Sequence, residues 1–163
     1  MWNTIYKHYY KIVSFLRSIW EGLCLIFRLT PQDYHRYAYI CDGHISKTEY
    51  IAGKLHCVRP IAYTSRPVFV ENSRAYTVIQ SEQLGDVVQM EVGALMVGKI
   101  HNHNYSKEVF KGEEKGYFEF GGSTIIVLIE KERVEVFDEI MKNTKEGKET
   151  RVCLGDAVGV LVS

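Results

Sequence analysis

Two short stretches of the chain carry residue types that could do chemistry. In the first, Gly121 and Gly122 precede Ser123 and Thr124 between two strand-like runs. Glycines in such a position often mark a bulge or a turn, because only glycine tolerates the backbone conformations required there. A serine hydroxyl in the same place can also serve a functional site. The pattern by itself leaves both interpretations open.

The second stretch centres on His35. Thr30 as N-cap, Pro31 at the first helical position and Asp33 in the first turn predict a short helix that carries His35 and Arg36. An imidazole titrates near neutral pH, so His35 is a candidate general acid. A helix histidine satisfied by local hydrogen bonds is the structural alternative. Arg36 either pairs with Asp33 at helical spacing or steers a substrate carboxylate.

The elements that must position these residues are mostly strands. The predicted fold class is α+β and mainly β, with antiparallel sheets packed as a sandwich or barrel-like core. Turn residues separate the strand-length segments, and an apolar run over 23–27 predicts one more, buried strand. The predicted strands are 45–51, 54–58, 67–71, 75–81, 86–92, 94–100, 115–119, 123–130 and 133–136, with a short helix over 137–143.

The first twenty-one residues predict an amphipathic helix, which precedes a domain over residues 22–163. Its apolar side chains recur at helical spacing, with Lys7, Lys11 and Arg17 between them. Such a helix either packs on its own domain or lies in a membrane interface with its cations outward. The apolar positions are Ile5, Tyr9, Ile12, Leu16 and Ile19.

Composition excludes several classes of function. The chain has 163 residues, with 20 Lys+Arg against 20 Asp+Glu, so bulk binding to nucleic acid is not expected. No cysteine pair has metal or redox spacing, and no signal peptide is evident, which indicates free thiols and a cytoplasmic protein. His101 and His103 have the residue types for a metal site with His56 and Cys57, but no sequence spacing ties the four together, so no metal is expected. A Cys–His nucleophile has no better support.

Two motifs together become recognisable. The segments are Phe118-Glu-Phe-Gly-Gly-Ser-Thr124 and Leu29-Thr-Pro-Gln-Asp-Tyr-His-Arg36. In this combination the chain resembles the phosphatidylserine decarboxylase family, from about Gly22 to Gly159. Supporting stretches in the same order are Gly53–His56, Glu71–Arg74 and Val92–Gly98.

The resemblance implies a lyase made as a self-cleaving zymogen. Ser123 would attack the carbonyl of Gly122, and the glycine pair would permit the strained backbone. Cleavage would leave a covalent pyruvoyl group at position 123, which acts as the electron sink for decarboxylation of phosphatidylserine to phosphatidylethanolamine. His35 would return the proton, and Thr124 would stabilise the oxyanion of self-cleavage. Asp33, Arg36 and Gly121 are supporting residues. The enzyme would lie peripherally on a membrane. The resemblance leaves open whether it forms a homo-oligomer.

Two departures from the family pattern divide the hypotheses. Many members carry a second histidine, thought to activate the serine, at the position of Ala38, and an upstream Asp-Gly segment that supports it. The sequence has neither, so it is expected to be a short form without the usual N-terminal segment. The first hypothesis is a short decarboxylase that matures with another base, such as His35. The alternative is a non-processing, catalytically inactive relative that binds a lipid or a partner.

Overall fold

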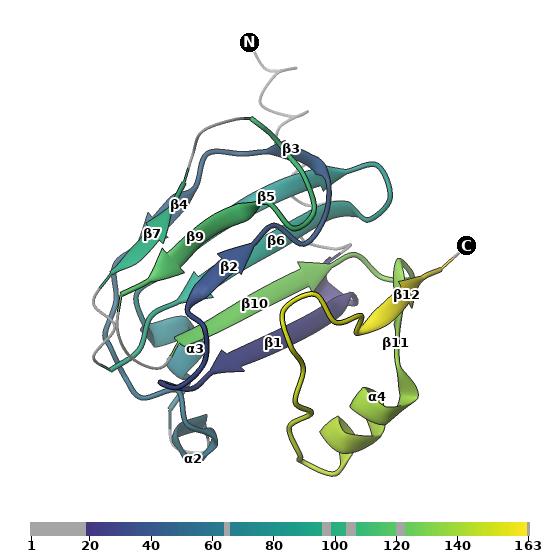
Figure 1. Cartoon of the computed structure of the whole chain (residues 1–163). Helices are drawn as coiled ribbons and strands as arrows, with labels where there is room; N and C mark the ends of the chain where they lie inside the picture. The colour runs from purple at the N-terminus through teal and green to yellow at the C-terminus, as the bar shows by residue number, and fades with distance from the viewer. Residues whose placement is uncertain (1–18, 64–65, 96–98, 104–106, 120–122, 163) are drawn as a thin grey trace, which may run out of the picture.

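The structure is a computed structural model that describes residues 19–63, 66–95, 99–103, 107–119 and 123–162. Most of the described residues that have regular structure lie in antiparallel strands, which confirms the mainly β prediction (Figure 1). The strands are β1 (Leu23–Leu29), β2 (Arg36–Ala38), β3 (Gly43–Ile45), β4 (Glu49–Ile51), β5 (Arg74–Ser81), β6 (Gly85–Val92), β7 (Ile100–Asn102), β8 (Glu108–Val109), β9 (Glu114–Phe118), β10 (Ser123–Ile129), β11 (Val134–Val136) and β12 (Gly159–Leu161). The helices are α2 (Pro60–Tyr63), α3 (Val68–Glu71) and α4 (Asp138–Lys145).

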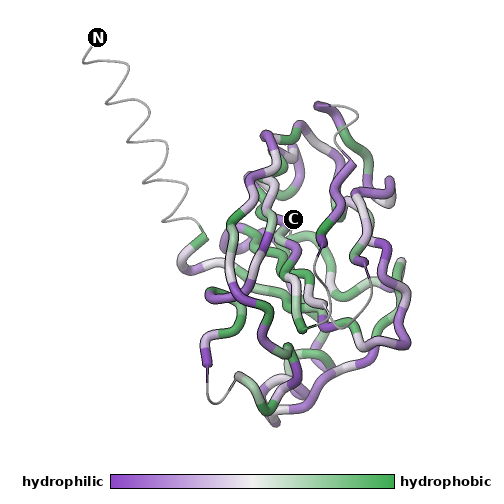
Figure 2. Tube along the Cα trace, turned by 90° about the vertical axis from the view of Figure 1, so that its left-hand side faces the viewer, coloured by the Kyte–Doolittle hydropathy of each residue, from purple (hydrophilic) through white to green (hydrophobic). Residues whose placement is uncertain are grey.

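A seven-stranded sheet and a three-stranded sheet form the centre of the molecule. The larger sheet has the order β1-β10-β6-β5-β3-β8, with β4 also paired to β5, and the smaller has the order β2-β9-β7. The amide of Gln89 on β6 donates to the carbonyl of Ala38 on β2 at 2.9 Å, so the two sheets face each other. Figure 2 shows hydrophobic stretches running through the middle of the molecule, as this packing requires.

Alternation along the strands decides which side chains face the smaller sheet. Ile125 on β10 pairs with Glu91 on β6 and with Phe27 on β1, so the odd-numbered residues of these strands share one face. That inner face carries the main apolar cluster, and burying it supplies most of the stabilisation. Its buried members are Tyr39, Cys41, Ile79, Leu84, Val87, Val109, Val127 and Ile129.

Several local predictions were wrong. The residues expected to start a helix at Thr30 form a turn instead, and the chain then enters β2. Residues 68–71, expected within a strand, form α3, whose first residue Val68 is buried. The apolar run expected to be a buried strand is β1, which lies at the end of the sheet order and is partly exposed. The predicted N-terminal helix falls almost entirely on residues 1–18, outside the described residues.

Candidate functional site

Two chain connections run between the sheets at the same end of the molecule. Leu29 at the end of β1 pairs with Ser123 at the start of β10. On the smaller sheet, the amide of Phe118 at the end of β9 donates to the carbonyl of His35, just before β2, at 2.9 Å. Both connections therefore start and finish on neighbouring strands. The two motifs of the sequence come together here, although Gly121 and Gly122 lie outside the described residues.

Ser123 is the first residue of β10 and is fully buried. Its Oγ has no hydrogen-bond partner among the described residues, and the same holds for Oγ1 of the buried Thr124. A buried polar atom without a partner costs about 1–3 kcal/mol. Two adjacent orphaned hydroxyls are unusual in a strand that serves structure alone, so they favour the functional interpretation of the Gly-Ser-Thr motif.

His35 presents one ring nitrogen to the same end of the molecule. Its Nδ1 lies 2.7 Å from the carbonyl oxygen of Asp33. A carbonyl only accepts, so Nδ1 carries the proton of the neutral ring and Nε2 keeps its lone pair. Nε2 is buried and has no partner within the described ranges. His35 can therefore accept or return a proton at Nε2.

Asp33 shapes the turn that carries His35. Its Oδ2 accepts hydrogen bonds from the backbone amide of Thr30 at 2.7 Å and from the Thr30 hydroxyl at 2.8 Å. The Asp33 amide donates back to the Thr30 carbonyl at 3.0 Å. These bonds explain why cap-like residues occur here without a helix, since the same reciprocal pattern closes an isolated turn.

The hydrogen bonds from Thr30 lower the pKa of the Asp33 carboxyl. A lowered folded-state pKa adds stability above the ordinary value of about 3.9, and that stability is lost as the pH falls through the folded-state value. We expect Asp33→Ala to lower the melting temperature at pH 7, and the difference from wild type to shrink as the pH falls below about 3.9. Thermal unfolding at both pH values measures this. A difference that stays constant with pH would show that the carboxylate charge is not involved.

Arg36 does not pair with Asp33, contrary to one of the two roles expected for it. Its guanidinium instead forms an ion pair with Glu114 and lies 5.1 Å from the centre of the Tyr117 ring. The reason is that Arg36 belongs to β2, where it pairs with Tyr117 of β9, and not to a helix. The contacts place it on the smaller sheet and leave its expected role with the substrate carboxylate untested.

A pocket of about 370 Å³ is lined in part by Gly93, which lies opposite Ser123 across the sheet. Thr124 pairs with Val92, so Ser123 and Gly93 occupy the next positions on β10 and just beyond β6. The Gly93 amide donates to the carbonyl of Ser73 at 2.9 Å, which continues the row to β5. The residues that line the pocket are Tyr50, Ile51, Ala52, Ser73, Arg74, Gly93, Lys99, Ile100 and His101.

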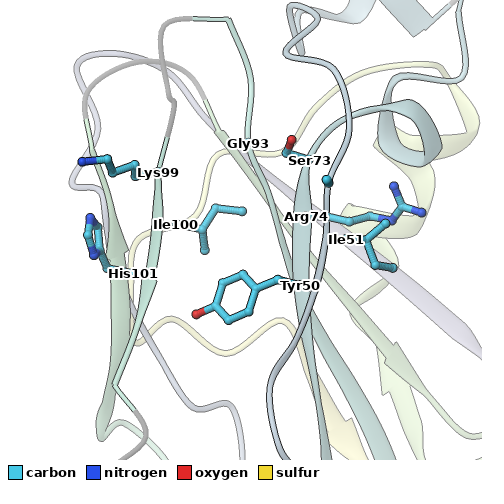
Figure 3. A pocket seen from close by; sticks show the side chains of 9 residues that line it. Tyr50, Ile51, Ser73, Arg74, Gly93, Lys99, Ile100 and His101 are labelled. Atoms are coloured by element: carbon cyan, nitrogen blue, oxygen red, sulfur yellow. The ribbon is translucent and has the colours of Figure 1, made fainter.

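The interior of this pocket is mainly apolar. Figure 3 shows Tyr50 and Ile100 pointing into it from opposite sides, whereas Arg74 and Lys99 point away from it. Gly93 adds no side chain between the pocket and the neighbouring position of Ser123. Sequence reasoning missed this pocket, because its walls come from β4 and β7, which belong to different sheets.

A buried ion pair lies on the same inner face. Lys115 Nζ donates to both carboxylate oxygens of Glu91 at 2.8 Å and to Oδ1 of Asn102 at 2.8 Å, and both charged side chains are fully buried. Burial raises the pKa of Glu91 and lowers the pKa of Lys115, while their attraction opposes both shifts. Glu91 pairs with Ile125, two residues from Ser123, so the pair lies diagonally beside the site.

The histidines considered as metal ligands bind carboxylates instead. Nε2 of His101 lies 2.7 Å from Glu119, and Nε2 of His103 lies 2.9 Å from Glu114. Nε2 of His56 lies 2.9 Å from Glu71. Within the described residues, no group of three or more potential ligands could hold a metal ion.

The cysteines show no sign of an activated thiol. All four are free, and Cys24 and Cys153 are exposed as whole residues. Burial raises the pKa of the Cys41 thiol and of the Cys24 thiol, which lowers their nucleophilic fraction.

No helix in the described ranges has both the length and the hydropathy needed to cross a membrane.

Comparison with known proteins supplies the class of the site. The family model described as phosphatidylserine decarboxylase matches residues 2–160. The chain therefore belongs to the phosphatidylserine decarboxylase family, as its two motifs indicated. No solved structure matches the chain.

Individual relatives carry the same name. The chain is 47% identical over 144 residues to phosphatidylserine decarboxylase proenzyme 2 of Clostridium acetobutylicum, covering 88% of this chain and 49% of the relative. It is 45% identical over 141 residues to the proenzyme of Clostridium tetani, covering 85% and 48%. The chain thus spans about half the length of these curated relatives.

Proposed function

We propose that this chain matures by self-cleavage between Gly122 and Ser123 and decarboxylates phosphatidylserine to phosphatidylethanolamine at a cytoplasmic membrane surface. The observation that carries the proposal is the presence of two orphaned polar atoms at the same end of the two sheets. These are the buried Ser123 Oγ and the buried His35 Nε2. The names of the relatives do not favour the alternative of a non-processing binding module.

The residues present fit a pyruvoyl group at position 123. In maturation, Ser123 Oγ would attack the Gly122 carbonyl and displace the Ser123 amide nitrogen, which forms an ester. Elimination would then release Gly122 as a carboxylate and leave a dehydroalanine at position 123, and hydrolysis of its imine form, with loss of ammonia, would leave the new group on the C-terminal piece. That group would supply an electron sink for the departing carboxylate. The pocket would receive an amine-bearing headgroup beside position 123, since Gly93, which lines it, carries no side chain.

The chain's own side chains would divide the remaining work. Thr124 Oγ1 has no other partner within the described residues, so it is available to the oxyanion of self-cleavage. His35 Nε2 would take the proton from Ser123 during maturation, because Ala38 offers no basic group. After decarboxylation the same nitrogen would return a proton to the α-carbon. Asp33 would hold the His35 ring through its carbonyl oxygen.

Lipid conversion tests this function directly. The purified chain is incubated with phosphatidylserine vesicles, and the lipids are separated and quantified by mass spectrometry. Wild type should form phosphatidylethanolamine, whereas Ser123→Ala, which removes only the attacking hydroxyl, should form none. Equal amounts of product from both proteins, or none from a wild type that has cleaved itself, would overturn the proposal.

A further inference from the structure

Exposed apolar side chains lie on the segments that line the pocket and on the segments next to them. Tyr50 and Ile51 line the pocket and are 56% and 37% exposed. The neighbouring segments add four further exposed apolar residues. These are Leu55, Ile61, Val70 and Leu95, of which Ile61 is 79% exposed. Together, these six residues form what we call the docking face.

One buried side chain holds most of this surface together. Asn72 is fully buried, and its amide donates to the carbonyls of His56 and Gly93 at 2.8 Å, while its Oδ1 accepts from the His56 amide at 3.0 Å. The Leu95 amide also reaches the His56 carbonyl at 3.3 Å. The segments that carry Leu55, Val70 and Leu95 are therefore fixed to one another and to Gly93, which lines the pocket.

The lower end of the molecule in Figure 1 carries α2 and α3, beside the start of β10. Figure 2 shows hydrophobic and hydrophilic segments next to one another at that end. A contiguous group of exposed apolar side chains that is rimmed by polar residues marks an interaction surface. This group lies beside the pocket that Gly93 lines, next to the position of Ser123, which connects it with the proposed substrate.

The charges around the docking face favour an anionic partner. Exposed cations accompany the apolar residues. Of these cations, Lys54 lies 4.0 Å from Glu71, which also binds His56 at 2.9 Å, and Lys99 lies 3.9 Å from Glu119, so both retain only loose ion pairs. These cations are Lys54, Arg59, Arg66 and Lys99. Apolar side chains with a cationic rim are the composition that binds the interface of an anionic bilayer, where each cation near the surface adds attraction.

We propose that the docking face rests on an anionic lipid bilayer and turns the mouth of the pocket toward the lipid headgroups. The proposal rests on the proposed function for its substrate, but not for its binding. A headgroup could then reach position 123 while the acyl chains stay in the bilayer. The exposed apolar rim would thus make the enzyme act on a membrane lipid and not on a free amino acid.

Vesicle flotation of the full chain tests the proposal. The probes are phosphatidylcholine vesicles with and without phosphatidylglycerol, an anionic lipid that has no amine. The wild type should float with the anionic vesicles. Ile61→Glu combined with Val70→Glu should lower the bound fraction about tenfold or more, because two apolar contacts are replaced by charges that the surface repels. Both positions are exposed, so folding should not change.

A matched control makes the same charge change outside the docking face. Phe110→Glu combined with Leu154→Glu alters two exposed apolar residues and should leave flotation at the wild-type level. Arg59→Ser combined with Arg66→Ser should remove most of the preference for anionic vesicles. Equal flotation of the docking and control variants would overturn the proposal and assign membrane binding to another part of the chain. If the wild type forms a dimer and does not float, and the docking variant is a monomer while the control variant stays a dimer, this surface is a subunit interface instead.

The two proposals fail separately in this design. Phosphatidylglycerol cannot be decarboxylated, so Ser123→Ala should float as the wild type does. Flotation without conversion of phosphatidylserine would leave the docking face intact and refute the enzyme activity. If the Ile61→Glu, Val70→Glu protein converts phosphatidylserine vesicles at the wild-type rate, the enzyme activity stands and the docking face is refuted.

Discussion

Replacing Lys115 by methionine is expected to destabilise the protein by about 3–5 kcal/mol, because it leaves the Glu91 carboxylate buried without its partner. Both side chains are fully buried, and no solvent can compensate for the lost charge. Urea unfolding at pH 7 measures the change. The double variant Glu91→Leu, Lys115→Met removes both charges and should recover most of the loss, since an apolar pair of similar volume is often as stable as the buried ion pair.

The pH dependence separates this charge effect from a simple packing defect. Burial raises the pKa of Glu91, and without Lys115 nothing of opposite charge offsets that rise. An acid whose folded-state pKa is raised binds its proton more tightly when folded, so Lys115→Met should gain stability, relative to wild type, as the pH falls from 7 toward 5. A loss that does not change with pH, or that persists in the double variant, would mean that packing of the Lys115 side chain dominates.

Loss of His35 is expected to slow both reactions of the site. His35→Ala should lower turnover of phosphatidylserine by about 10²–10⁴-fold, the usual contribution of a general acid or base. Self-cleavage should slow as well, because Ala38 has no group that accepts a proton and His35 Nε2 is a buried, orphaned nitrogen. A time course by intact-mass spectrometry follows maturation, and lipid analysis of the matured fraction follows turnover.

An exposed histidine supplies the control for that variant. His44 lies on β3, where it pairs with Gln80, away from both connections. His44→Ala should mature and turn over lipid as the wild type does. If His35→Ala behaves like His44→Ala, the unpartnered Nε2 has no part in the chemistry. If His35→Ala matures normally but turns over slowly, its role is confined to the proton returned after decarboxylation.

The long strands were predictable because their signal is local. β5, β6 and β10 fall within a residue of the expected limits, since each is an apolar-rich run bounded by turn residues. The turn at Thr30 was not predictable, because its capping residues suit a helix and a turn equally. Pairing of Arg36 with Tyr117, far along the chain, decided that the next residues form a strand.

The candidate site divides in the same way. Ser123 and His35 could be named from two motifs, although nothing local showed that they meet at one end of the sheets. The sequence motifs gave no role to Glu91 and Lys115, because only the packing of one sheet on the other brings them together and buries them. The pocket likewise depends on Tyr50 and Ile100 from different sheets, so no single segment could reveal it.

The most direct test of this account is the intact mass of the purified chain beside that of Ser123→Ala. The wild type should give two pieces, residues 1–122 with an ordinary carboxyl end and residues 123–163 carrying the pyruvoyl mass in place of the serine. The variant should remain a single species of 18.8 kDa. A wild type that stays whole after prolonged incubation with anionic vesicles would contradict the central claim, because the orphaned Ser123 hydroxyl would then not attack the chain.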